Sequence, residues 1–338
     1  MIRTPPTRPR LLAALQVLSL ALPLAATPAF AQSTDADFAP LAKARKLTEL
    51  TALARDRALQ NPKDDVALWY WVRSSDGDAT LRADLTRRAE ACVAALPQSA
   101  RCHNALGGLL AQAAVSGGMT AVLKLAGRIK EAFAKAVELD PRHFAMRRDL
   151  AQFYLQAPGI AGGSVRKAIQ NADEFMQFDA PRGQLLRADV HAYEKEFPQA
   201  EALLMAVKPG ADADLTQALQ ASTTSLGFSL LGAEQAARAQ KVFERAAALE
   251  ASGPAASIAQ LGLGRALLAQ SQTDAAIVAL ERALQLDPKS MAHYRLGMAY
   301  QSKGDAPKAR ASYKQFLTVV SEGKAADDAR QRLGSLGD

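Results

Sequence analysis

The carboxy-terminal third of the chain repeats one pattern of small and large residues. Three glycines each follow a leucine. An alanine stands twelve positions after each glycine, and a large apolar residue stands sixteen positions after it. The glycines are Gly227, Gly264 and Gly297, and the large residues are Phe243, Leu280 and Tyr313. The last two copies are 33 residues apart, which is close to the period of about 34 residues of a helix–turn–helix repeat.

This spacing has a physical explanation in helix packing. A glycine where two antiparallel helices cross lets their backbones approach, and a large residue on the second helix fills the space that the glycine leaves. Proline cannot continue a helical hydrogen-bond ladder, so Asp287-Pro288 is expected to end the second helix. Neither helix buries its apolar stripe alone, so each pair needs a neighbouring pair.

The pattern resembles the tetratricopeptide repeat family. The resemblance implies an all-α superhelical solenoid, and we expect about seven to eight antiparallel helix pairs followed by a capping helix. We predict irregular repeats over residues 38–207, with loop insertions at 114–126 and 157–163. Regular repeats are predicted over 213–322 and a polar capping helix over 323–338, with a flexible joint at residues 208–212.

The amino terminus has the order of a secretory signal peptide. Arg3, Arg8 and Arg10 precede an apolar run over residues 11–26, and small residues follow at Ala29 and Ala31. The run is shorter than the roughly 20 residues of a membrane-spanning helix, although an uncleaved anchor is the alternative. No cysteine stands at the cleavage point, which argues against a lipoprotein. We therefore expect signal cleavage after residue 31 and a soluble periplasmic protein with no integral membrane segment.

Charge and motif content exclude several functions. Residues 1–31 hold three arginines and no acidic residue, so their removal lowers the formal net charge from +7 to +4. The remaining charges are interspersed, which argues against a nucleic-acid partner. The four histidines are scattered, and Gly227-Phe228-Ser229 lacks the closing glycine of a hydrolase nucleophile elbow. The sequence therefore predicts no enzyme, no catalytic residue, no metal and no cofactor.

Two cysteines suit an oxidising compartment. Cys92 and Cys102 flank Pro97, which is expected to end one helix shortly before the next begins. Helices meeting at such a turn can bring two cysteines within bonding range, so we predict a disulfide. Free or metal-binding thiols are the alternative, but two cysteines and His103 fall short of a tetrahedral zinc set.

The first helix of each pair is expected to line a concave groove. Two positions of that helix lie four residues apart and therefore share one face: the residue two before the motif leucine and the residue just after the motif small residue. These positions predict partner-binding residues at Asn104, Arg148, Gln152, Phe228, Arg265, Tyr294 and Met298. Taken singly, each is equally an ordinary surface side chain.

The glycine-rich insertions suggest a second site. Within the resemblance, they are similar to accessory repeat lipoproteins of tripartite periplasmic transporters, although the lipid-attachment cysteine is missing. The loop residues nominated are Pro158, Gly159, Gly162 and Gly163, and the alternative is that both insertions only adjust repeat curvature.

Two functions follow from the sequence. The first is a periplasmic scaffold that binds a protein or peptide segment in its groove, for example in envelope assembly or export. The alternative is a small-ligand-binding accessory protein of a transport system. The partner, the pathway and the oligomeric state are not specified by the sequence.

Overall fold

The structure is a computed structural model that describes residues 32–44, 46–75, 79–249 and 253–337. The predicted signal peptide lies outside the described residues. Within them all regular structure is helical, and no helix is long and apolar enough to span a membrane. In chain order the helices are α1 (Asp35–Lys43), α2 (Leu47–Gln60), α3 (Asp65–Ser74), α4 (Ala79–Ala95), α5 (Ala100–Ser116), α6 (Gly118–Leu139), α7 (Phe144–Gln156), the 3-10 turn η1 (Gly159–Ala161), α8 (Val165–Met176), α9 (Ala180–Tyr193), α10 (Phe197–Ala206), α11 (Ala213–Gly232), α12 (Ala236–Leu249), α13 (Gly253–Ala269), α14 (Thr273–Leu286), α15 (Ala292–Ser302), α16 (Ala306–Val319) and α17 (Lys324–Ser335).

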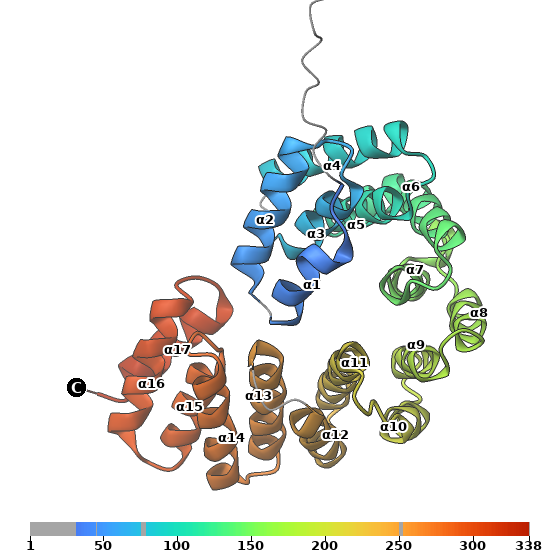
Figure 1. Cartoon of the computed structure of the whole chain (residues 1–338). Helices are drawn as coiled ribbons and strands as arrows, with labels where there is room; N and C mark the ends of the chain where they lie inside the picture. Colours follow the sequence, from blue (N-terminus) through green and yellow to red (C-terminus); the bar gives the residue numbers. More distant parts are fainter. Residues whose placement is uncertain (1–31, 45, 76–78, 250–252, 338) are drawn as a thin grey trace, which may run out of the picture. The chain divides into compact units, whose positions relative to one another are not determined.

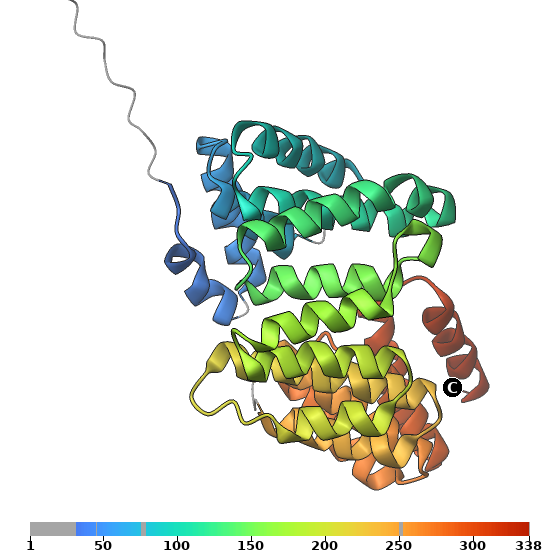
Figure 2. The same ribbon diagram turned by 90° about the vertical axis from the view of Figure 1, so that its right-hand side faces the viewer.

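Counted from α1, the described helices form eight successive pairs, and α17 follows the last pair. The prediction of seven to eight pairs with a capping helix is therefore confirmed. Neighbouring hairpins stack side by side, so that α7, α9 and α11 form an inner layer and α8, α10 and α12 an outer layer (Figures 1 and 2). This alternation places the first helix of each of these pairs on the inner face.

The small–large pairs of the repeat pack as the sequence predicts. A Cβ atom added to Gly227 would lie 2.7 Å from the ring of Phe243, and one added to Gly297 would lie 2.5 Å from the ring of Tyr313. Gly264 faces Leu280 in the same way, at 2.5 Å. The large side chains are fully buried, so each glycine sets the close approach of the two helices in its pair.

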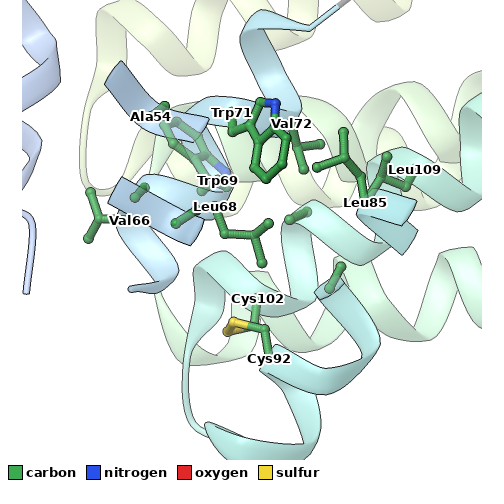
Figure 3. Packing of buried hydrophobic residues seen from close by; sticks show 14 of the residues in the cluster. Ala54, Val66, Leu68, Trp69, Trp71, Val72, Leu85, Cys92, Cys102 and Leu109 are labelled. Carbon is green, nitrogen blue, oxygen red and sulfur yellow. A yellow bond between two sulfur atoms is a disulfide. The ribbon is translucent and has the colours of Figure 1, made fainter. Parts of the chain in front are cut away.

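The amino-terminal pairs share an aromatic core. Trp69 and Trp71 of α3 pack with Leu85 of α4 and Leu109 of α5, and the two cysteines lie beside this cluster (Figure 3). Cys92, near the end of α4, and Cys102, in the first turn of α5, form the predicted disulfide with their Cα atoms 5.5 Å apart. The bridge joins α4 to α5, which also contact each other through Leu85 and Leu109.

The loop predicted at residues 114–126 is wrong. Helix α5 continues to Ser116 and α6 begins at Gly118, so that only a tight turn at Gly117 interrupts the helices. The segment carries apolar residues at helical spacing, and Ala114 and Ala126 are buried. The insertion therefore lengthens both helices instead of forming a loop.

The other predicted breaks fall between helices. Residues 157–163 contain the short turn η1 between α7 and α8, and residues 208–212 join α10 to α11. Gly323, with a φ of 92°, precedes the capping helix α17. Near the amino end of the described residues, α1 ends at Lys43 and α2 begins at Leu47.

Candidate functional site

One pocket lies where α5 and α6 extend beyond the ordinary repeat. Its volume is about 470 Å³, and α3, α5, α6 and α7 all contribute to it. We call it the apolar pocket, because most of its wall is aliphatic or aromatic. The apolar side chains include Val72, Val115, Val122, Ile129, Phe133 and Phe153.

A chain of hydrogen bonds forms one polar side of the apolar pocket. The indole Nε1 of Trp69 donates to Oδ1 of Asn104 at 2.7 Å, and Nδ2 of Asn104 donates to Oδ2 of Asp149 at 2.9 Å. Nη1 of Arg73 also donates to Oδ2 of Asp149, at 2.9 Å. The charges of Arg73 and Asp149 compensate each other, so this side of the pocket is close to neutral.

A second, smaller pocket of about 230 Å³ lies between α7, α9 and α11. Gln152 and Gln156 of α7 line both pockets, and Nε2 of Gln156 donates to Oε1 of Gln152 at 2.8 Å. Of the described residues in the wall of the second pocket, Asp189 alone is charged. We therefore call it the acidic pocket.

Asp189 is held in an unusual environment for a carboxylate. Its side chain is 12% exposed, the nearest cation is Nε of Arg148 at 3.7 Å, and Oδ2 has no hydrogen-bond partner among the described residues. The hydroxyl of Ser222, a residue only 2% exposed, lies close enough to Asp189 to act on this carboxylate as a hydrogen-bond donor. Burial raises the pKa of Asp189, and the nearby Arg148 and Ser222 oppose that shift only in part.

Arg148 also borders a wider cavity of about 680 Å³ that includes residues of α1, α2, α3 and α11. Four cations line this cavity, and each already has a carboxylate partner. The pairs are Lys43–Asp214, Arg73–Asp149, Arg148–Asp189 and Arg182 with Asp179 and Asp212. Arg73 and Arg182 are hydrogen-bonded to their carboxylates, whereas Lys43–Asp214 and Arg148–Asp189 are each 3.7 Å apart.

The predicted groove residues of the carboxy-terminal repeats fall into two groups. Phe228 and Arg265 contact each other, with the guanidinium 5.2 Å from the ring centre, and burial followed by the charge of Arg295 lowers the pKa of Arg265. Tyr294 and Met298 instead pack into the cluster that α17 completes. The hydroxyl of Tyr294 donates to Asp328 of α17 at 2.6 Å.

The structure gives the glycines of the 157–163 loop a backbone role. Gly162 has a φ of 96°, and a Cβ atom added to Gly163 would lie 1.8 Å from the carbonyl oxygen of Ala157. Pro158 and Gly159 open the η1 turn, and the following serine caps α8. These contacts account for the glycines through the local fold and do not test ligand binding at the loop.

Of the predicted groove residues, Asn104 and Gln152 come together at one pocket, whereas Arg148 lies beside the adjacent one. Asp149 and Asp189 were missed. Asp189 directly follows Ala188, the small residue of its repeat, and so occupies the same repeat position as Gln152 and Arg265. The repeat pattern of α9 is weak, so the groove positions of its repeat were not assigned from the sequence, although the spacing of four residues used for the other repeats predicts Asp189.

No group of three or more His, Cys, Asp or Glu side chains in the described part has a metal-binding arrangement.

A sequence model of the tetratricopeptide repeat family matches residues 225–291 and 267–330. This match shows that residues 225–330 are tetratricopeptide repeats, and the stacked helix pairs before them have the same kind of fold. A comparison with curated protein sequences finds no match.

Solved structures with a similar fold include yeast Tom70, which is 14% identical to this chain with a TM-score of 0.59. That match covers 86% of this chain and 59% of the Tom70 chain. YrrB, described as a TPR protein with an unusual peptide-binding site, is 18% identical over 60% of this chain and 99% of its own, with a TM-score of 0.39. Pseudomonas aeruginosa pilF is 15% identical over 69% and 97%, with a TM-score of 0.43. At these identities the similarity concerns the fold alone.

Proposed function

We propose that the inner face of α3, α5, α7, α9 and α11 binds an extended segment of a partner protein. The observation that carries this proposal is the sharing of Gln152 and Gln156 by the apolar and acidic pockets. The shared residues make the two pockets parts of one groove that crosses successive repeats, as solenoid binding surfaces do. Glutamine amides both donate and accept hydrogen bonds, so they suit a peptide backbone passing between two side-chain pockets.

The proposed setting is the bacterial periplasm, in envelope assembly or export. The signal-like order of residues 1–31 and the Cys92–Cys102 disulfide support this setting, because disulfides persist in oxidising compartments.

A second candidate function is the binding of a small apolar ligand, as in an accessory protein of a transport system. The specific observation in its favour is that the 114–126 insertion helps to build the apolar pocket, through Ala114, Val115, Val122 and Ala126. The pocket volume of about 470 Å³ falls within the range of roughly 300–1,000 Å³ that is usual for small-molecule sites.

Selection of displayed random peptides on the purified protein tests the first function, with fluorescence anisotropy to measure the affinity of each selected peptide. Gly108→Phe is the blocking variant, because Gly108 lines the apolar pocket and a Cβ atom there meets nothing within 4 Å. Gly127→Phe is the matched control, since Gly127 is also an interior helix glycine with open space around it but lies outside the pocket.

We expect selected peptides to bind the wild type and the Gly127→Phe control but to bind Gly108→Phe at least tenfold more weakly. Failure to select any peptide would contradict the first function. Saturable binding of the neutral fluorophore N-phenyl-1-naphthylamine, lost only in Gly108→Phe and without any peptide binding, would support the second.

A further inference from the structure

We infer that the bound segment carries an uncharged apolar side chain for the apolar pocket and, close to it in sequence, a lysine or arginine for the acidic pocket. This inference rests on the proposed function and goes beyond it by specifying the chemistry of the partner.

The preference of the apolar pocket follows from its wall and from its saturated polar side. Asn104, Asp149 and Arg73 already satisfy one another, so a charged group entering there would lose its hydration without finding a free opposite charge. The rest of the wall, which includes Ile129, Phe133 and Phe153, is apolar. Burial of aliphatic or aromatic atoms against it is therefore favourable.

The preference of the acidic pocket follows from Asp189. Among the described residues the ion-pair partner of Asp189 is Arg148 at 3.7 Å, and Ser222 is its hydrogen-bonding neighbour. A cationic side chain inside the pocket would add favourable charge to this carboxylate at closer range. Burial raises the pKa of Asp189. The nearby cation and hydroxyl therefore do not fully offset the cost of burying its negative charge. The hydroxyls of Ser225 and Ser229 in the same wall can accept hydrogen bonds from an ammonium or guanidinium group.

The two side chains must be near neighbours in the segment, because the pockets meet at Gln152 and Gln156. An extended chain advances about 3.3 Å per residue and places alternate side chains on the same face. An apolar residue and a cationic residue two or a few positions apart would therefore enter adjacent pockets, while the backbone between them passes the two glutamine amides.

Parallel peptide selections on paired variants test this inference. Asp189→Asn removes the charge of the acidic pocket, and Gly108→Phe fills the apolar pocket. The matched controls are Asp173→Asn, a half-exposed carboxylate on α8 that pairs with Arg187 at 3.2 Å, and Gly127→Phe. Circular dichroism and thermal unfolding establish that every variant is folded, and Asp189→Glu, which keeps the charge, is the conservative comparison.

Peptides selected on the wild type and on both controls should be enriched in lysine or arginine together with a large apolar residue. The basic enrichment should disappear on Asp189→Asn while the apolar enrichment stays, and the reverse should hold for Gly108→Phe. In one selected peptide, changing the basic residue to methionine should weaken wild-type binding at least tenfold but leave Asp189→Asn binding unchanged.

Two results would overturn the inference. In the first, peptides bind while the methionine change lowers their affinity for the wild type and for Asp189→Asn equally. Asp189 then does not contact the cationic side chain, although the proposed groove still binds peptides. If the wild type selects acidic or charge-neutral peptides, the assignment of the acidic pocket is wrong. Failure to select any peptide removes the groove function itself, and the inference with it.

Discussion

The ring of Phe243 occupies the space that a side chain on Gly262 would need, since a Cβ atom there would lie 2.1 Å from Cε1 of the ring. The same ring also lies against Gly227, where a Cβ atom would be 2.7 Å away. Phe243 belongs to α12, whereas the two glycines belong to α11 and α13. One buried side chain therefore fixes the spacing both within a helix pair and between that pair and the next.

Replacing Gly262 with alanine should destabilise the protein, because the added methyl group forces Phe243 or a helix to move. Overpacking of a close-packed core costs about 1–3 kcal/mol, and we expect a loss of that size in the free energy of unfolding from urea denaturation. Gly127→Ala is the control, since a Cβ atom there meets nothing within 4 Å, and it should be neutral or stabilising by up to about 1 kcal/mol. Equal stability of the two variants would mean that this packing is not tight.

The contrast between Gly227 and Gly262 shows how far the sequence could predict the fold. Gly227 and Phe243 belong to one repeat and stand at a fixed spacing, so a pattern within a single repeat is enough to pair them. Gly262 belongs to the next repeat, and its contact depends on how two hairpins stack. Contacts within pairs, and hence the helical solenoid, were predictable, whereas contacts between pairs required the structure.

The candidate site was predictable only in part, for similar reasons. The spacing rule identified Asn104 and Gln152, which line the apolar pocket, because both stand in repeats with clear small residues. A ligand site at the glycine-rich insertions was expected, but as a loop at residues 114–126, where the structure instead extends two helices. Tyr294 obeys the same rule as Asn104, but α17 packs against it.

Removal of the disulfide should lower stability without removing the fold. Cys92 and Cys102 are ten residues apart, and closing a loop of this size stabilises a protein by about 3 kcal/mol in the chain-entropy estimate. We expect the variant with both cysteines changed to alanine to lose up to that amount in urea denaturation while keeping its helical circular dichroism spectrum. Thiol titration of the unfolded, non-reduced wild type should find no reactive thiol, and two reactive thiols would refute the bridge.

Tyr294 and Gln152 occupy two of the predicted groove positions, yet the structure assigns them different effects. Tyr294→Phe removes the hydrogen bond to Asp328, so it should lower the free energy of unfolding by about 1 kcal/mol and leave peptide affinity unchanged. Gln152→Ala removes an amide shared by both pockets, so it should weaken peptide binding with little effect on stability. Urea denaturation and fluorescence anisotropy on both variants check the pair, and a binding loss in Tyr294→Phe would show that the groove extends to α15.

Asp189 should make the protein less stable as the pH rises. A well-paired carboxylate has the opposite effect. Burial raises its pKa, with Arg148 of α7 and Ser222 of α11 opposing the shift in part. The folded state therefore holds this proton more tightly than the unfolded chain does, and its contribution to stability is complete below the ordinary aspartate pKa. That contribution is lost as the pH rises through the folded-state value.

Asp189→Asn cannot lose this proton, so its stability relative to the wild type should increase between acidic and neutral pH. Urea denaturation at a series of pH values measures the difference between the two proteins, and Asp173→Asn serves as the control for charge removal outside the pocket. A gap that stays constant or shrinks as the pH rises would mean that Arg148 stabilises the ionised carboxylate fully. In that case Asp189 and Arg148 form an ordinary structural ion pair, and the acidic pocket has no unmet charge to offer a partner.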